Sequence, residues 1–102
     1  MKFDALYDKI EKVVPKDGSK NEFGFLAYLV EEVGEVSRCI LENNGLKKRN
    51  QTESVLSECS DVLNSLLGLY IKLGGTKELL VKNAMKKSIR WEKRVNSKER
   101  VK

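Results

Sequence analysis

The sequence predicts an all-α protein organised as a four-helix bundle. Long stretches carry apolar residues at the 3.6-residue spacing of an amphipathic helix, and the chain has one proline, Pro15. No Asn-Gly or Asp-Gly pair is flanked by alternating strands, so the usual signals of a β-hairpin are missing. The chain of 102 residues is the size of one domain, and we see no internal repeat or second domain.

The first two predicted helices cover 3–14 and 21–43. The first ends at Pro15 and the turn over 16–19, so that 1–20 forms an N-terminal helix and turn. The second ends at Asn43-Asn44-Gly45, which is a left-handed stop signal. Their expected core residues are Phe3, Leu6, Ile10, Val13, Leu26, Leu29, Val30, Val33, Ser37 and Ile40.

The third and fourth predicted helices cover 53–73 and 77–95. Thr52 and Thr76 are the expected N-caps, and Gly74-Gly75 ends the third helix. We expect 96–102 to be a flexible tail. The third helix is apolar over more than the usual stripe, which predicts a homodimer or homotetramer that buries the excess. The expected core residues here are Val55, Leu56, Cys59, Leu63, Leu66, Leu67, Tyr70, Leu73, Leu80, Ala84, Trp91 and Val95.

Several function classes are excluded by composition. The chain has no histidine, which rules out Ser-His-Asp and Cys-His nucleophiles and His-containing zinc sites. We interpret Cys39 and Cys59 as reduced core residues, with one disulfide as the alternative. The N-terminus is too charged for a signal peptide and no 18-residue apolar run occurs, so we expect a cytoplasmic protein without a membrane segment.

Charge is distributed unevenly along the chain. Residues 72–102 hold eleven basic and three acidic side chains, whereas 21–37 and 53–71 hold seven acidic side chains and no Lys or Arg. Small polar residues, including Asn64, Ser65 and Gly68, surround the acidic positions of the third helix. Glu31, Glu32 and Glu35 share one flank of the second helix, and Glu58 and Asp61 are three apart on the third.

Carboxylates gathered in this way repel one another and favour binding of a cation. Mg²⁺ is the expected ion, because it is held by a few carboxylates while substrate phosphates and water complete its coordination. The alternative is an ordinary solvated acidic face.

The fourth predicted helix carries a basic stripe. Asn83, Lys87, Arg90 and Arg94 fall at positions i, i+4, i+7 and i+11. Such a stripe can neutralise a triphosphate, with Arg giving bidentate contacts and Lys a point charge. The alternative is a solvated basic helix end, since lysine is favoured near a helix C-terminus.

Two acidic motifs carry a resemblance to a known superfamily. Glu31-Glu32-Val33-Gly34-Glu35 reads as EExxE, and Glu58-Cys59-Ser60-Asp61 reads as ExxD. Together, over 22–94, they resemble the MazG-type all-α nucleoside triphosphate pyrophosphohydrolases. The resemblance implies a MazG-like fold and Mg²⁺, with Mn²⁺ as a substitute. Glu31 and Glu35 would be catalytic, and the implied metal ligands are Glu32, Glu35, Glu58 and Asp61.

The resemblance also implies a reaction. Water attacks the α-phosphorus of a nucleoside triphosphate and gives the monophosphate and pyrophosphate, in a housecleaning role against non-standard nucleotides. The expected substrate contacts are Asn83, Lys87, Arg90 and Tyr28. Many members carry Lys at the position of Tyr28 and an aromatic residue at that of Ser65. Tyr28 and Trp91 either stack on a base or pack in the core, and core packing is favoured for both.

Other readings stay open. A phosphoribosyl-ATP pyrophosphohydrolase shares the acidic motifs and the small size. A second reading takes residues 72–102 as a surface for the phosphate backbone of nucleic acid, but no helix-turn-helix signature accompanies them and the other helices are acidic. A non-catalytic helical adaptor or nucleotide-binding protein is the third reading.

Overall fold

The computed structural model describes residues 2–18, 21–43 and 55–101, and every regular element in these ranges is helical. The all-α prediction is therefore confirmed. Among the described helices, none is long and apolar enough to cross a membrane. The elements in chain order are α1 (Lys2–Val13), the short 3₁₀ helix η1 (Val14–Lys16), α2 (Glu22–Asn43), α3 (Val55–Lys72) and α4 (Lys77–Val101).

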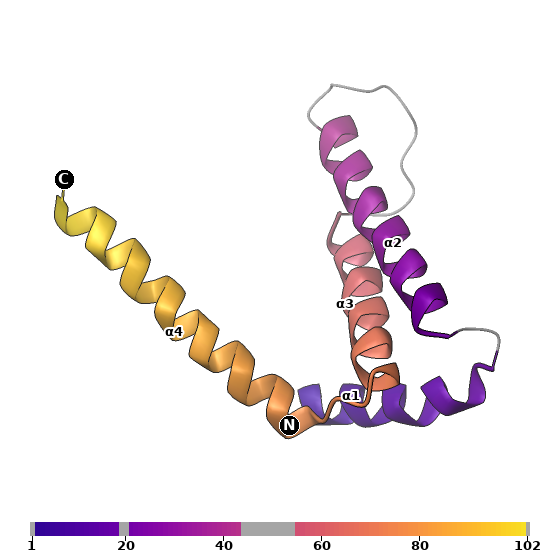
Figure 1. Cartoon of the computed structure of the whole chain (residues 1–102). Coiled ribbons are helices and arrows are strands. Elements are labelled where there is room, and N and C mark those ends of the chain that lie inside the picture. The colour runs from indigo at the N-terminus through magenta and orange to yellow at the C-terminus, as the bar shows by residue number, and fades with distance from the viewer. Residues whose placement is uncertain (1, 19–20, 44–54, 102) are drawn as a thin grey trace.

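Helices α2 and α3 lie side by side as an antiparallel hairpin, and α1 crosses the end where α2 begins and α3 ends (Figure 1). Gly68 allows the two hairpin helices to approach closely, because a Cβ atom there would lie 3.1 Å from the Phe25 ring. Tyr7 of α1 is fully buried against this end of the hairpin. The buried apolar residues are Tyr7, Val14, Phe25, Cys39 and Leu67.

Local signals end the helices where the sequence predicts. Gly74 adopts a φ of 92°, its amide donates to the Ile71 carbonyl at 2.9 Å, and α3 stops there. The Leu79 amide donates to Thr76 Oγ1 at 3.3 Å, which confirms Thr76 as the cap of α4. The predicted cap Thr52 lies outside the described residues.

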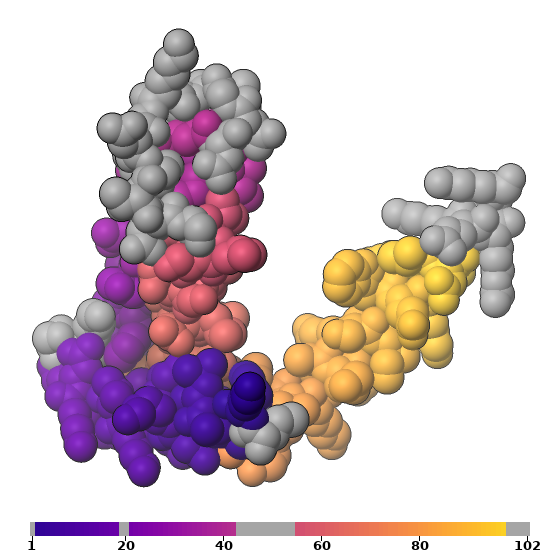
Figure 2. Space-filling view, turned by 180° about the vertical axis from the view of Figure 1, so that it is seen from behind, coloured from indigo at the N-terminus to yellow at the C-terminus, as the bar shows by residue number. Residues whose placement is uncertain are grey.

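Helix α4 leaves the hairpin and extends alone (Figures 1 and 2). The Cα radius of gyration is 16.9 Å, whereas a compact chain of this length is expected to have about 13 Å. The prediction that the four helices form one bundle is therefore wrong for the single chain. The helix also continues past its predicted end at 95, to Val101.

Several predicted core residues are exposed in the single chain. Val30 is 64% and Trp91 62% exposed, and Cys59, which we expected in the core, is exposed with a free thiol. Periodicity finds the apolar face of a helix but does not identify the neighbour that covers it. Helix α2 turns a different face, with Phe25 and Cys39, towards α3. The other predicted core residues that are exposed include Val13, Leu26, Val33, Ile40, Leu56, Leu63, Leu66, Leu73, Ala84 and Val95.

Candidate functional site

Three of the predicted metal-binding carboxylates come together between α2 and α3. Glu32 of α2 and Glu58 and Asp61 of α3 each offer a carboxylate oxygen, and these oxygens lie within 4.8 Å of one another. Glu58 is only 7% exposed. The three-residue spacing of Glu58 and Asp61 places both on one face of α3, and the antiparallel packing brings that face to Glu32. We call these three residues the acidic cluster.

Tyr28 lies one helical turn before Glu32 and belongs to the same surroundings. The negative charge of Glu32 raises the pKa of Tyr28, and burial and a hydrogen bond with the Glu32 side chain raise it further. The charges of Asp61 and Glu31 act in the same direction. Tyr28 is 41% exposed, so it is an accessible side chain beside the acidic cluster and not the core residue we favoured.

The remaining two glutamates of the EExxE motif are placed differently. Glu35 forms an ion pair and hydrogen bond with Arg38, one turn further along α2. Glu31 is exposed, although its charge reaches Tyr28. The structure thus brings together three of the four expected ligands, while Glu35 is engaged by a neighbouring cation.

A pocket of about 280 Å³ adjoins the acidic cluster, and Tyr28 and Asp61 line it. Its other walls come from α1, η1 and the residue that follows η1, and from the hairpin, and they combine apolar with polar side chains. Ser65, one of its polar residues, donates a hydrogen bond to the Asp61 carbonyl at 2.8 Å. The remaining lining residues are Ile10, Val13, Val14, Asp17, Phe25, Asn64 and Gly68.

Sequence reasoning did not assign these further pocket residues to a site. Asn64 and Ser65 carried a signal, because they belong to the small polar face around Glu58 and Asp61. Asp17 carried none, since it follows α1 and reaches the pocket only through the way α1 crosses the hairpin. The contribution of α1 is a tertiary feature that the spacing within one helix does not encode.

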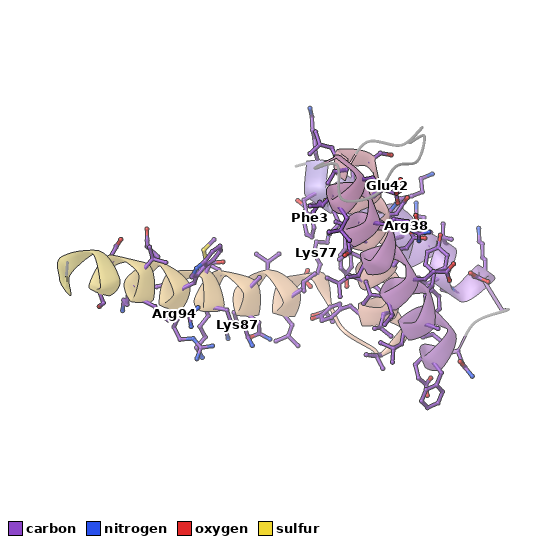
Figure 3. All side chains as sticks on the ribbon, turned by 90° about the horizontal axis from the view of Figure 1, so that it is seen from above. Phe3, Arg38, Glu42, Lys77, Lys87 and Arg94 are labelled. Atoms are coloured by element: carbon purple, nitrogen blue, oxygen red, sulfur yellow. The ribbon has the colours of Figure 1, made fainter. Side chains whose placement is uncertain are left out.

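The predicted substrate contacts on α4 are apart from the acidic cluster. Asn83, Lys87 and Arg90 are exposed on a helix that, in the described residues, does not pack on α2 or α3. Figure 3 shows Lys87 and Arg94 on the projecting helix, well separated from Arg38 on the hairpin. A single chain therefore does not bring the basic stripe to the carboxylates.

Comparisons with protein-family models, with curated proteins and with solved structures found no match for this chain. The candidate site is accordingly defined by its own geometry, which is a carboxylate cluster between two helices that opens on a partly apolar pocket. Its chemistry follows from these residues and from the two acidic motifs that carry them.

Proposed function

We propose that this protein is a Mg²⁺-dependent nucleoside triphosphate pyrophosphohydrolase that converts (d)NTP and water into (d)NMP and pyrophosphate. The observation that supports this most strongly is the acidic cluster at the edge of a pocket, with Asp61 in both. The resemblance of the EExxE and ExxD motifs to the MazG-type superfamily supports the same reaction.

The donor atoms of the cluster fit the proposed ion. Mg²⁺ prefers carboxylate oxygens, and Glu32, Glu58 and Asp61 offer three of them from two helices. The segments 21–37 and 55–71 hold no Lys or Arg that would neutralise these charges instead. Glu35 would join as a ligand by leaving its ion pair with Arg38. Mn²⁺, with the same preference for oxygen, is expected to substitute.

When bound, the ion supplies charge that offsets the build-up of negative charge on the leaving pyrophosphate. The chain's own residues supply the rest. A carboxylate must accept the proton of the attacking water because the chain has no histidine, and Glu31 and Glu35 are our candidates. Glu31 is exposed, whereas Glu35 would first have to leave its ion pair with Arg38.

The pocket supports binding of a nucleobase. Its volume of about 280 Å³ is near the lower end of small-molecule sites. Val13, Val14 and Phe25 supply apolar surface for the base, while Asp17 and Asn64 offer polar atoms that can read its edge. Tyr28 lies between this pocket and the acidic cluster, where the sugar and the α-phosphate would sit.

Turnover of a nucleotide panel tests the proposal. The purified protein is incubated with each NTP and dNTP, and with phosphoribosyl-ATP, in the presence of Mg²⁺, and products are separated by ion exchange. We expect a monophosphate and pyrophosphate, with activity lost on addition of EDTA. A diphosphate and phosphate would contradict the proposal, because they require attack at the γ-phosphorus. Cleavage of phosphoribosyl-ATP alone would favour the related enzyme, and no turnover at all would favour a binding protein.

Matched variants then test the site. Asp61→Asn and Glu32→Gln keep the size of each side chain and are expected to lower turnover by about 100-fold or more. Glu22→Gln is the control, because Glu22 is an exposed acid at the start of the same helix α2. Circular dichroism is expected to show unchanged helix content in all three. Full turnover by Asp61→Asn would remove the acidic cluster from the mechanism.

A further inference from the structure

Helix α4 presents an apolar face that the other described residues do not cover. Val81, Ala84, Trp91 and Val95 repeat at alternating spacings of three and four, with Ser88 filling the remaining position of a heptad seam. Val81 is 43% and Trp91 62% exposed, and Met85 beside them is 59% exposed. Figure 2 shows the helix extending away from the body formed by the other three.

The hairpin carries two further uncovered seams. On α2 the seam consists of Leu26, Val30, Val33 and Ile40, which are between 46% and 64% exposed. On α3 the seam consists of Leu56, Cys59, Leu63 and Leu66, all of which are exposed. Both seams follow the spacing of three and four that allows side chains of a neighbouring helix to interlock. The chain therefore exposes matching surfaces on α4 and on the hairpin.

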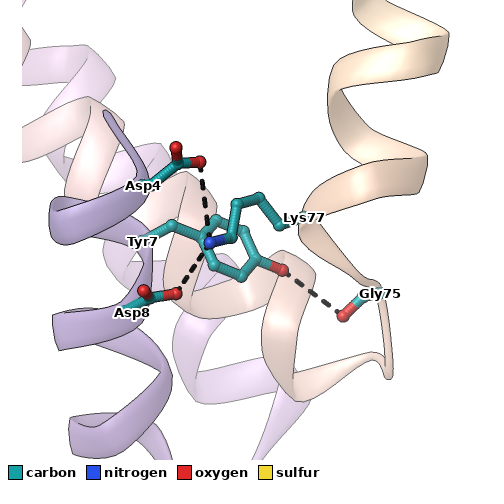
Figure 4. Close-up of polar contacts among 5 residues, drawn as sticks. All are labelled: Asp4, Tyr7, Asp8, Gly75 and Lys77. Carbon is teal, nitrogen blue, oxygen red and sulfur yellow. Dashed lines mark hydrogen bonds and ion pairs between the residues drawn. The ribbon is translucent and has the colours of Figure 1, made fainter. Parts of the chain in front are cut away.

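The junction between α3 and α4 fixes the direction of α4 (Figure 4). The Tyr7 hydroxyl donates to the Gly75 carbonyl at 3.4 Å, and the Tyr70 hydroxyl donates to the Thr76 carbonyl at 3.0 Å. Lys77 Nζ lies 2.9 Å from a carboxylate oxygen of Asp8. These contacts hold the first turn of α4 against α1, so that α4 projects from its own hairpin.

The net charges and lengths of the helices indicate which partner packs on these exposed apolar surfaces. Helix α4 holds nine basic and three acidic residues, whereas α2 and α3 together hold seven acidic and two basic residues. At 1.5 Å per residue, α4 is about 37 Å long and α2 about 33 Å. A second copy of this chain therefore offers an apolar surface of matching length on two helices whose net charge is opposite to that of α4.

The exposed area is large enough for such an assembly. The chain exposes 8098 Å², whereas a folded monomer of this mass is expected to expose about 5,800 Å². A standard interface buries about 800 Å² on each partner. The difference exceeds that requirement.

We propose that α4 of one copy lies along the α2–α3 hairpin of a second copy, and that the exchange is reciprocal within a two-fold symmetric dimer. The apolar face of α4 covers the two hairpin seams, and its flanking basic side chains lie beside acidic residues of the partner. This inference rests on exposed surface and charge and does not depend on the proposed catalytic function.

Sedimentation velocity across a dilution series tests the dimer. The wild type is expected to sediment as a dimer of twice the 11.6 kDa chain mass. Ala84→Glu places a charge within the apolar seam of α4 and is expected to raise the dimer dissociation constant more than about 100-fold. Leu79→Glu makes the same type of change on the opposite, basic side of α4 and is expected to leave the dimer intact. A monomeric wild type, or equal effects of the two variants, would overturn the proposal.

Two native probes report which surfaces meet. Trp91 is the chain's one tryptophan and lies on α4, while the exposed thiol of Cys59 lies on the α3 seam and Cys39 is buried. On dimerisation the Trp91 fluorescence emission is expected to shift to shorter wavelength, and the reaction of Cys59 with a thiol reagent is expected to slow. Both changes are expected to have the same midpoint protein concentration in the dilution series. The Ala84→Glu variant is expected to show neither change.

The same two probes distinguish the competing arrangements. If α4 instead paired with α4 of the partner, Trp91 would become buried while Cys59 stayed reactive. If α4 folded back on its own hairpin, both probes would be protected at every dilution in a monomer. Either result would contradict the exchange of α4 between two copies.

Discussion

Tyr7 holds together three parts of the chain. Its ring is fully buried, lies 6.2 Å from the Phe3 ring between centroids, and carries Lys77 Nζ at 5.9 Å from its own centroid. Its hydroxyl reaches the Gly75 carbonyl beyond the end of α3. Burial, followed by the charge of Glu11, raises the pKa of Tyr7 above its ordinary value of 10.0.

This raised pKa predicts loss of stability at alkaline pH. The unfolded chain loses the Tyr7 proton near pH 10, whereas the folded chain retains it to higher pH. The contribution is therefore fully present below pH 10 and is lost as pH rises through the raised value. In urea titrations between pH 9 and 11.5, the wild type is expected to lose up to about 1.4 kcal/mol per pH unit more than Tyr7→Phe. Parallel curves would show that Tyr7 ionises equally in both states.

Replacement of Gly74 and of Gly34 by alanine is expected to change the stability of the fold in opposite directions. Gly74 has a φ of 92°, so Gly74→Ala forces a side chain into a left-handed conformation and is expected to cost about 1–2 kcal/mol. Gly34 lies inside α2 with no atom within 4 Å of an added Cβ, and Gly34→Ala is expected to stabilise by about 0.5–1 kcal/mol. Urea unfolding measures both, and a stabilising Gly74→Ala would contradict the assigned turn.

At the level of the helices, Thr76 begins α4 as a cap. Thr76→Ala removes the oxygen that accepts from the Leu79 amide and is expected to cost about 1 kcal/mol locally. Hydrogen exchange at the Leu79 amide is then expected to speed up about fivefold, because fraying is confined to the first turn. Thr76→Ser keeps the oxygen and serves as the control. Unchanged exchange in Thr76→Ala would mean that packing of Lys77 on α1 holds this turn.

Helix ends could be predicted from the sequence where the signal is local. Gly74 and Thr76 act through their own backbone and the next few residues, so both predictions are confirmed. The faces of the helices were harder to predict. Val30 and Trp91 belong to clear apolar stripes, yet both are more than half exposed in the part of the chain that the structure describes. An apolar stripe indicates which face of a helix is expected to be buried, but it does not indicate which helix or which subunit packs against that face.

The candidate site was predictable to the extent that it depends on spacing within helices. Glu58 and Asp61 share a face of α3 at a three-residue interval, and their meeting with Glu32 follows once α2 and α3 pair. Glu35 shares the motif but forms its own ion pair with Arg38, a choice of rotamer that spacing does not determine. Asp17 reaches the pocket through the crossing of α1, which is set by tertiary packing.

For the whole molecule, the projecting helix predicts a distinctive scattering profile. Solution X-ray scattering of the Ala84→Glu monomer is expected to give a radius of gyration close to the 16.9 Å of the single chain. A value near 13 Å, as in compact domains of this length, would mean that α4 closes onto its own hairpin. Leu79→Glu is expected to stay a dimer and to give about twice the forward scattering of the monomer at the same mass concentration.

Helix α1 contacts both the pocket and the first turn of α4. Ile10 and Val13 line the pocket, while Tyr7 and Asp8, two to six residues earlier in the same helix, hold the start of α4. A nucleotide that steadies α1 in the pocket would thereby also steady the direction of α4, and association through α4 would steady α1 in return. By thermodynamic reciprocity, each event would strengthen the other by the same factor. The twelve residues of α1 would then couple occupancy of the pocket to the number of copies in the assembly.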